Sequence, residues 1–75
     1  MTDINEEFLT ESLTEIVNSE IEKIKNPNMT KREKFKQVSG IAISRFKREF
    51  PNVDILQFYE DDGSYQITLS INDLH

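Results

Sequence analysis

The sequence predicts an α+β fold, in which two helices are followed by a β-hairpin and pack on one face of its small antiparallel sheet. Apolar residues recur every three or four positions through most of residues 3–49, which is the period of amphipathic helices. Two stretches rich in β-branched and aromatic residues then flank an Asp-Gly pair, a strong indication of a two-residue hairpin loop. Because the chain has 75 residues, we expect one domain, residues 1–75, with a single small core.

The first helix is predicted over residues 3–25. Asp3 is the predicted N-cap, with Glu6 at the capping-box position three residues later. Asn26 and Pro27 end the helix, because proline lacks the amide donor and clashes with the preceding turn. The residues that share its apolar face are Leu9, Leu13, Ile16, Val17, Ile21 and Ile24.

The second helix is predicted over residues 31–49. Thr30 and Glu33 fit the capping-box pattern at its start, and the residue before Pro51 is pushed out of the α region at its end. Gly40 lies opposite the apolar face, where glycine costs about 1 kcal/mol relative to alanine. It either permits close approach of a partner backbone or is an incidental exposed glycine. The apolar face consists of Phe35, Val38, Ala42, Phe46 and Phe50.

The remaining residues predict two antiparallel strands, residues 53–60 and 65–71, joined by a loop at Asp62 and Gly63. A two-residue loop pairs Asp61 with Ser64 and fixes the register of both strands. One face then receives the pairs Phe58–Ile67 and Leu56–Leu69, and the other receives Ile55–Ser70, Gln57–Thr68 and Tyr59–Gln66. The register therefore separates an apolar face from a mixed face.

The predicted hairpin also raises the question of self-association. A two-stranded sheet is marginally stable alone and leaves both of its edges open. In the predicted register, Val53, Ile55 and Tyr59 lie on the mixed face, away from the helices. We therefore expect a homodimer that forms through this face or through a strand edge.

The composition excludes several classes of site. The chain has no Cys, two Gly and one His, which is its last residue. It therefore lacks a disulfide scaffold, a cysteine-ligated zinc module, a thiol nucleophile and a glycine-rich phosphate loop. We expect no enzyme, and no catalytic, cofactor or metal site. Glu60, Asp61 and Asp62 lack the ligand spacing of a calcium loop and are expected to form a solvated turn.

Location is predicted from the N-terminal residues and the apolar runs. The acidic start lacks the basic and apolar regions of a secretory signal. The longest apolar runs are three residues, too short to cross a membrane. We therefore expect a cytoplasmic protein that does not act at a membrane.

The charges are segregated along the chain, which has 14 acidic and 9 basic residues and a formal net charge of -5. Residues 1–22 contain seven acids and no Lys or Arg. Residues 23–48 contain all nine bases and one acid, and residues 49–75 contain six acids and no Lys or Arg. The small net charge therefore conceals separate acidic and basic segments.

The first helix carries an acidic face, opposite its apolar one. Each step of four residues along it rises about 6 Å, close to the phosphate spacing along one DNA strand, which is about 6–7 Å. Like charges at this spacing cost about a few tenths of a kcal/mol per pair, so helix stability does not explain them. The acidic face is either a solvated surface or a surface that binds a basic protein. It consists of Glu7, Glu11, Glu15 and Glu22, with Asp61 and Asp62 as a second candidate patch.

The second helix offers an alternative, because its cations can contact phosphates. Two observations oppose direct nucleic-acid binding: both flanking segments are acidic, and no aromatic residue alternates with the cations on the exposed face. The cations can instead pair with the first helix and the hairpin, or bind an acidic protein. Glu20, at the edge of the first apolar face, is expected to pair with Lys34 or Arg45. The cations are Lys31, Arg32, Lys34, Lys36, Arg45, Lys47 and Arg48.

No family motif is present, but the chain resembles, as a class, the short acidic accessory proteins with which phages and mobile elements block host factors. Some proteins of that class mimic DNA. The resemblance implies an inhibitor or modulator that binds a basic, DNA-binding host protein through the acidic face. The main alternative is a small nucleic-acid-binding transcriptional regulator that uses the second helix. A third is a neutral scaffold or immunity-type module that binds through Ile55 and Tyr59 on the outer face of the hairpin.

Overall fold

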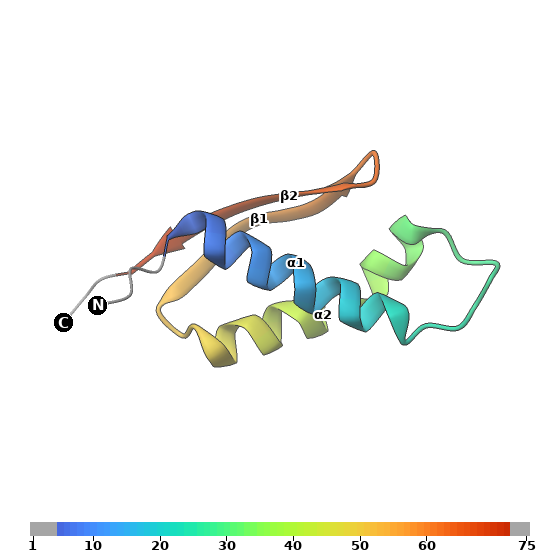
Figure 1. Cartoon of the computed structure of the whole chain (residues 1–75), viewed down its shortest axis with the longest axis horizontal. Coiled ribbons are helices and arrows are strands. Elements are labelled where there is room, and N and C mark those ends of the chain that lie inside the picture. The colour runs from blue at the N-terminus through green and yellow to red at the C-terminus, as the bar shows by residue number, and fades with distance from the viewer. Residues whose placement is uncertain (1–4, 73–75) are drawn as a thin grey trace.

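The structure is a computed structural model that describes residues 5–72. Helices α1 (Glu6–Glu22) and α2 (Lys31–Glu49) precede strands β1 (Val53–Asp61) and β2 (Ser64–Ile71). The strands form one antiparallel two-stranded sheet, and both helices lie on the same side of it (Figure 1). The predicted α+β architecture is confirmed, and each strand is one residue longer at the turn than predicted.

Helix α1 is shorter at both ends than predicted. Asn5 is its N-cap, in an extended conformation, and the Asn5 side-chain oxygen accepts a hydrogen bond from the Phe8 amide at 2.8 Å. The predicted start at residue 3 is therefore wrong, and Asp3, the predicted N-cap, lies outside the described residues. At the other end, the amides of Lys23 and Ile24 donate to carbonyls three residues back. This tighter turn ends the α-helical pattern before the predicted residue 25.

Helix α2 begins and ends as predicted. The Thr30 hydroxyl accepts from the Glu33 amide at 3.1 Å, and the Glu33 carboxylate accepts from the Thr30 amide at 2.8 Å. These two bonds confirm the capping box. Phe50 caps the far end, immediately before Pro51, as the restriction on residues that precede proline requires.

A β-bulge changes the predicted register at the start of β1. Near the turn the register is confirmed, with Asp62 and Gly63 as the two loop residues, both at positive φ. Leu56, however, has no partner, because two β1 residues oppose one β2 residue there. The predicted pairs Leu56–Leu69 and Ile55–Ser70 are wrong. The observed pairs are Ile55–Leu69 and Asp54–Ser70 before the bulge, and Gln57–Thr68, Phe58–Ile67, Tyr59–Gln66 and Asp61–Ser64 after it.

The bulge also exchanges the faces of the residues before it. Val53 is 2% exposed and Ile55 packs against the core, whereas Leu56 is 62% exposed. The predicted dimer surface of Val53, Ile55 and Tyr59 is therefore wrong as a single face, because only Tyr59 remains outside. The extra residue restores an inward position to Val53, since side chains alternate along a strand. Homodimer formation itself stays a prediction, but the apolar surface expected to support it is not present.

The core lies between the two helices and the inner face of the hairpin. Leu9, Leu13, Ile16 and Val17 come from α1, Phe35, Val38, Ala42 and Phe46 from α2, and Val53 and Leu69 from the strands. The Phe35 ring links helix and sheet, because its centroid lies 4.9 Å from that of Phe58 and 5.5 Å from that of Tyr65. The sequence-predicted apolar faces of both helices are thus the buried ones.

Alanine substitution of the two glycines should have opposite effects on stability. A Cβ at Gly40 would meet no atom within 4 Å, so Gly40→Ala should raise the free energy of unfolding by about 0.5–1 kcal/mol through helix propensity. Gly63 has φ +84°, so Gly63→Ala should lower it by about 1–2 kcal/mol. Urea denaturation followed by circular dichroism measures both. A destabilised Gly40→Ala protein would contradict the exposed position of Gly40.

Candidate functional site

The acidic face of α1 remains free of ion pairs in the structure. Glu7, Glu11, Glu15 and Glu22 are all exposed, and within residues 5–72 none of them lies within ion-pair distance of a basic side chain. The buried side of α1 packs on the core, so these carboxylates point away from it. The predicted set is therefore brought together as one continuous acidic surface.

Glu20 has a different role from the acidic face, because it is buried at 8% exposure. Its Oε2 accepts from the Arg45 guanidinium of α2 and, at 3.2 Å, from Lys23 Nζ. The predicted pairing with Arg45 is confirmed. The hydrogen bond from Arg45, followed by that from Lys23, holds the pKa of Glu20 below its ordinary value, against an opposing effect of desolvation. Glu20 thus joins the two helices and pairs with two cations.

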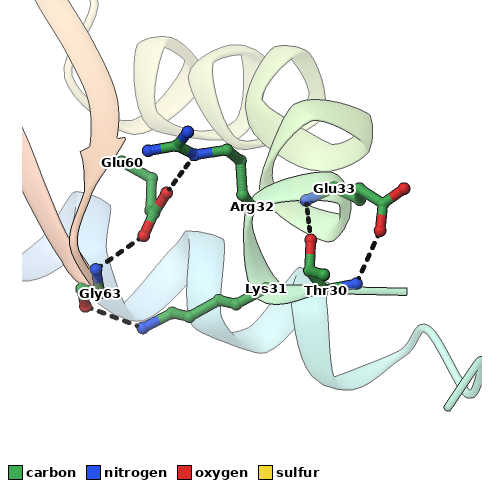
Figure 2. A network of polar contacts seen from close by, with 6 residues as sticks. All are labelled: Thr30, Lys31, Arg32, Glu33, Glu60 and Gly63. Atoms are coloured by element: carbon green, nitrogen blue, oxygen red, sulfur yellow. Dashed lines mark hydrogen bonds and ion pairs between the residues drawn. The ribbon is translucent and has the colours of Figure 1, made fainter. Parts of the chain in front are cut away.

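A network of polar contacts ties the hairpin turn to the start of α2 (Figure 2). Arg32 Nε donates to Glu60 Oε1 at 3.0 Å, and the Gly63 amide donates to Glu60 Oε2 at 2.7 Å. Lys31 Nζ donates to the Gly63 carbonyl at 3.1 Å and lies 4.9 Å from the centroid of the Tyr65 ring. The Gly63 amide, with Arg32 second, lowers the pKa of Glu60. These contacts hold the turn against α2.

The second predicted acidic patch lies at this turn. Asp61 and Asp62 are exposed there, and neither makes an ion pair with another described residue. Lys31 and Arg32 approach the same turn, so the charge around the two carboxylates is of mixed sign. The pair is therefore a weaker candidate for binding a basic partner than the acidic face of α1.

The cations of α2 do not form one free surface. Four of its seven cations contact other elements: Lys31, Arg32, Arg45 and Lys47. Lys47 Nζ donates to the Asp54 carboxylate at 3.0 Å and to the Val53 carbonyl at 2.9 Å. The hydrogen bond from Lys47, with a second from Asn72, lowers the pKa of Asp54. Much of the basic segment is thus used to attach α2 to α1 and to the hairpin.

A shallow groove of about 230 Å³ lies between α2 and β1. The Tyr59 ring is half exposed beside it, so the groove places an aromatic side chain next to Arg32 and Lys36. No sequence pattern indicates this arrangement, because the cations and the ring belong to different elements and meet only in the folded chain. The groove is lined by Arg32, Phe35, Lys36, Tyr59 and Glu60.

Comparisons with family models, curated proteins and solved structures find no match. Among residues 5–72, no group of three or more His, Cys, Asp or Glu side chains is placed to hold a metal ion. Neither described helix has the long apolar stretch that a membrane crossing requires. Functional inference for this chain therefore rests on its charged surfaces and its sheet edges.

The pairing of Glu20 predicts how stability depends on pH. Because the folded pKa of Glu20 is lowered from 4.5, its contribution is present above that value and is lost as the pH falls through the folded pKa. The free energy of unfolding should therefore decrease as the pH is lowered from about 5. Glu20→Gln should be less stable at pH 7 and should show a shallower decrease. Urea denaturation at several pH values measures this.

The control for this prediction is Glu15→Gln, which removes one carboxylate from the exposed side of the same helix. Glu15 makes no ion pair with a described residue, so this variant should keep the pH dependence of the unsubstituted protein. If the pH dependence of the free energy of unfolding is reduced equally in both variants, the Glu20 contacts are not the source of that dependence.

Proposed function

We propose that this protein is a small interaction module that binds a basic, DNA-binding protein through the acidic face of α1, and thereby inhibits or modulates that protein. One observation carries the proposal: no carboxylate of the acidic face makes an ion pair with another described residue, although the chain has nine basic residues. The basic residues that make ion pairs make them with Glu20, Asp54 and Glu60 instead. The carboxylates of the acidic face are therefore not used to hold the cations that attach α2 to the other elements.

The spacing of the acidic face supports competition with DNA. Along α1, Glu7, Glu11 and Glu15 recur at four-residue steps, which correspond to about 6 Å each. A protein surface that binds successive phosphates presents cations at a comparable spacing. Carboxylates arranged in this way would occupy that surface and exclude DNA from it, with an affinity that decreases as salt rises.

An exposed aromatic side chain beside the acidic face could add apolar contact. Phe8 is 49% exposed and lies one helical turn before Glu11. Its ring packs edge-on against Phe50, with centroids 6.2 Å apart, so it is held by the end of α2. Aromatic anchors of this kind supply much of the binding energy at interfaces.

The proposed role is that of a cytoplasmic accessory protein of the phage or mobile-element type. It requires no catalytic residue, cofactor or metal, since occupying the partner surface is sufficient. Asp61 and Asp62 would contribute at the edge of the contact, where Lys31 and Arg32 moderate their charge. The partner is then defined by chemistry as a protein with an exposed phosphate-binding surface.

Charge reversal on the acidic face should weaken partner binding. We expect Glu11→Lys or Glu15→Lys to weaken it by about tenfold or more, because each places a cation against a basic partner. The control is Glu49→Lys, which makes the same change of charge at an exposed position on α2. Quantitative affinity capture at low salt, with release by duplex DNA, measures the difference. Equal recovery of the partner by all variants would contradict the proposal.

The groove between α2 and β1 favours a second candidate function, a small nucleic-acid-binding regulator. Tyr59 offers a ring on which a base can stack, and Lys36 and Arg32 lie beside it for a phosphate. Lys36 makes no ion pair with a described residue. This aromatic element was missing from the sequence pattern, and it strengthens the alternative.

A gel-shift assay at low salt separates the two functions. If the protein acts by binding a DNA-binding partner, it should shift neither duplex nor single-stranded DNA, because its net charge of -5 repels both. A regulator that uses the groove should shift single-stranded DNA, and Tyr59→Ala together with Lys36→Ala should remove that shift. Such a result would favour the second function over the first.

A further inference from the structure

The outer edge of β1 has several features that oppose the addition of another strand. The Val53 amide donates to the Phe50 carbonyl at 3.1 Å, and the Val53 carbonyl accepts from Lys47 Nζ. The bulge at Leu56 then interrupts the regular spacing of the backbone groups. Three acidic side chains, Asp54, Glu60 and Asp61, also lie on this strand. Bulges and charges of this kind are the devices that protect an edge from pairing.

The outer edge of β2 has none of these protections. Ser64–Ile71 contains no charged residue, no proline and no glycine, and the bulge affects only β1. Asn72 donates to the Asn52 carbonyl at 2.7 Å, so the even-numbered residues of β2 bond to β1 and the odd-numbered ones point outward. Outside the β1–β2 ladder, no backbone hydrogen bond within residues 5–72 uses the outward groups, which belong to Tyr65, Ile67, Leu69 and Ile71.

Helix α1 lies next to this open edge. The Tyr65 hydroxyl donates to the Asn18 side-chain oxygen at 2.7 Å, which fixes the C-terminal part of α1 to β2. Asn18 follows Glu15 by three residues and precedes Glu22 by four, so it belongs to the same side of α1 as the acidic face. The acidic face therefore borders the edge of the sheet at which backbone groups are free.

We propose that the β2 edge and the acidic face of α1 form one binding site, which takes an extended, lysine- or arginine-bearing segment of the partner as a third strand. This inference rests on the proposed function and adds how the partner presents its cations. The segment would donate and accept backbone hydrogen bonds at Tyr65, Ile67, Leu69 and Ile71. Its side chains that point to the helical side of the sheet would carry their cations to the acidic face.

Charge and spacing support an extended basic segment as the occupant. Side chains on one face of a strand recur about every 6.7 Å, close to the roughly 6 Å between successive carboxylates on the acidic face. A second copy of this chain would instead bring its own α1, with four more carboxylates, toward the same edge. Complementary charge therefore favours the basic segment over self-association.

The test uses the full chain and a capped nine-residue peptide of alternating lysine and valine, labelled for fluorescence anisotropy. The matched control peptide has the same sequence with N-methyl groups on alternate backbone amides, which keeps the charge and removes edge hydrogen bonding. We expect the control to bind at least about tenfold more weakly. Amide exchange should slow at Tyr65, Ile67, Leu69 and Ile71 with the parent peptide and at none of them with the control.

Two protein variants separate this inference from the proposed function. Thr68 of β2 and Gln57 of β1 lie opposite each other on the outer face of the sheet. Thr68→Lys and Gln57→Lys therefore make the same change of charge, one on β2 and the other on β1. We expect Thr68→Lys to weaken peptide binding by about threefold or more relative to Gln57→Lys, because only β2 contacts the added strand.

Three results would overturn the inference. Equal binding of both peptides, with changes confined to α1 amides, would show that cations bind the acidic face without strand addition, and the proposed function would stand. Failure of the parent peptide to bind would reject an extended basic segment, while the capture experiment still judges the acidic face. If amide exchange at the β2 edge becomes slower when the protein concentration is raised without any peptide, the occupant is a second copy of this chain.

Discussion

The bulge at Leu56 is the constraint on which the arrangement of the hairpin depends. One extra residue in β1 places Val53 in the core and pairs Ile55 with the buried Leu69. Without it, the alternation of side chains would turn Val53 toward solvent and Leu56 toward the helices. The bulge therefore turns one apolar face of the sheet toward the helices and leaves Leu56 and Tyr59 as exposed apolar side chains of β1. It also makes β1 a poor edge for pairing, which leaves β2 as the open edge.

A second constraint divides the carboxylates into two groups. Glu20, Asp54 and Glu60 hold the cations of α2, and these contacts attach α2 to α1 and to the hairpin. The carboxylates of the acidic face take no part in this and remain exposed on α1. Exposed ion pairs contribute little to stability, so the acidic face could have been neutralised or lost at little cost to the fold. An unneutralised acidic surface that repels itself is more readily explained by binding than by folding.

The two proposals meet at α1, because the same helix carries the acidic face and lies against β2. The Tyr65–Asn18 hydrogen bond holds these elements together, and the contacts among Lys31, Glu60 and Gly63 hold the turn against α2. The turn end of the hairpin, where the open edge begins, is thus fixed to both helices. A preformed edge of this kind reduces the ordering cost on binding.

The sequence by itself determined the local features of this protein. Helical periodicity identified the buried faces of α1 and α2, the Thr30–Glu33 pattern identified the start of α2, and Asp62-Gly63 identified the turn, because each depends on neighbouring residues. It also located the acidic face and offered Lys34 or Arg45 as the partner of Glu20, between which the structure selects Arg45. The N-cap at Asn5 was missed because Asp3 offered an equally suitable side chain. Only the tertiary structure decided the bulge, the burial of Val53, the groove beside Tyr59 and the free edge of β2. These depend on how the hairpin packs against the helices. A strand pattern alone does not specify where an extra residue is inserted, and here that residue is what turns Val53 and Ile55 toward the core.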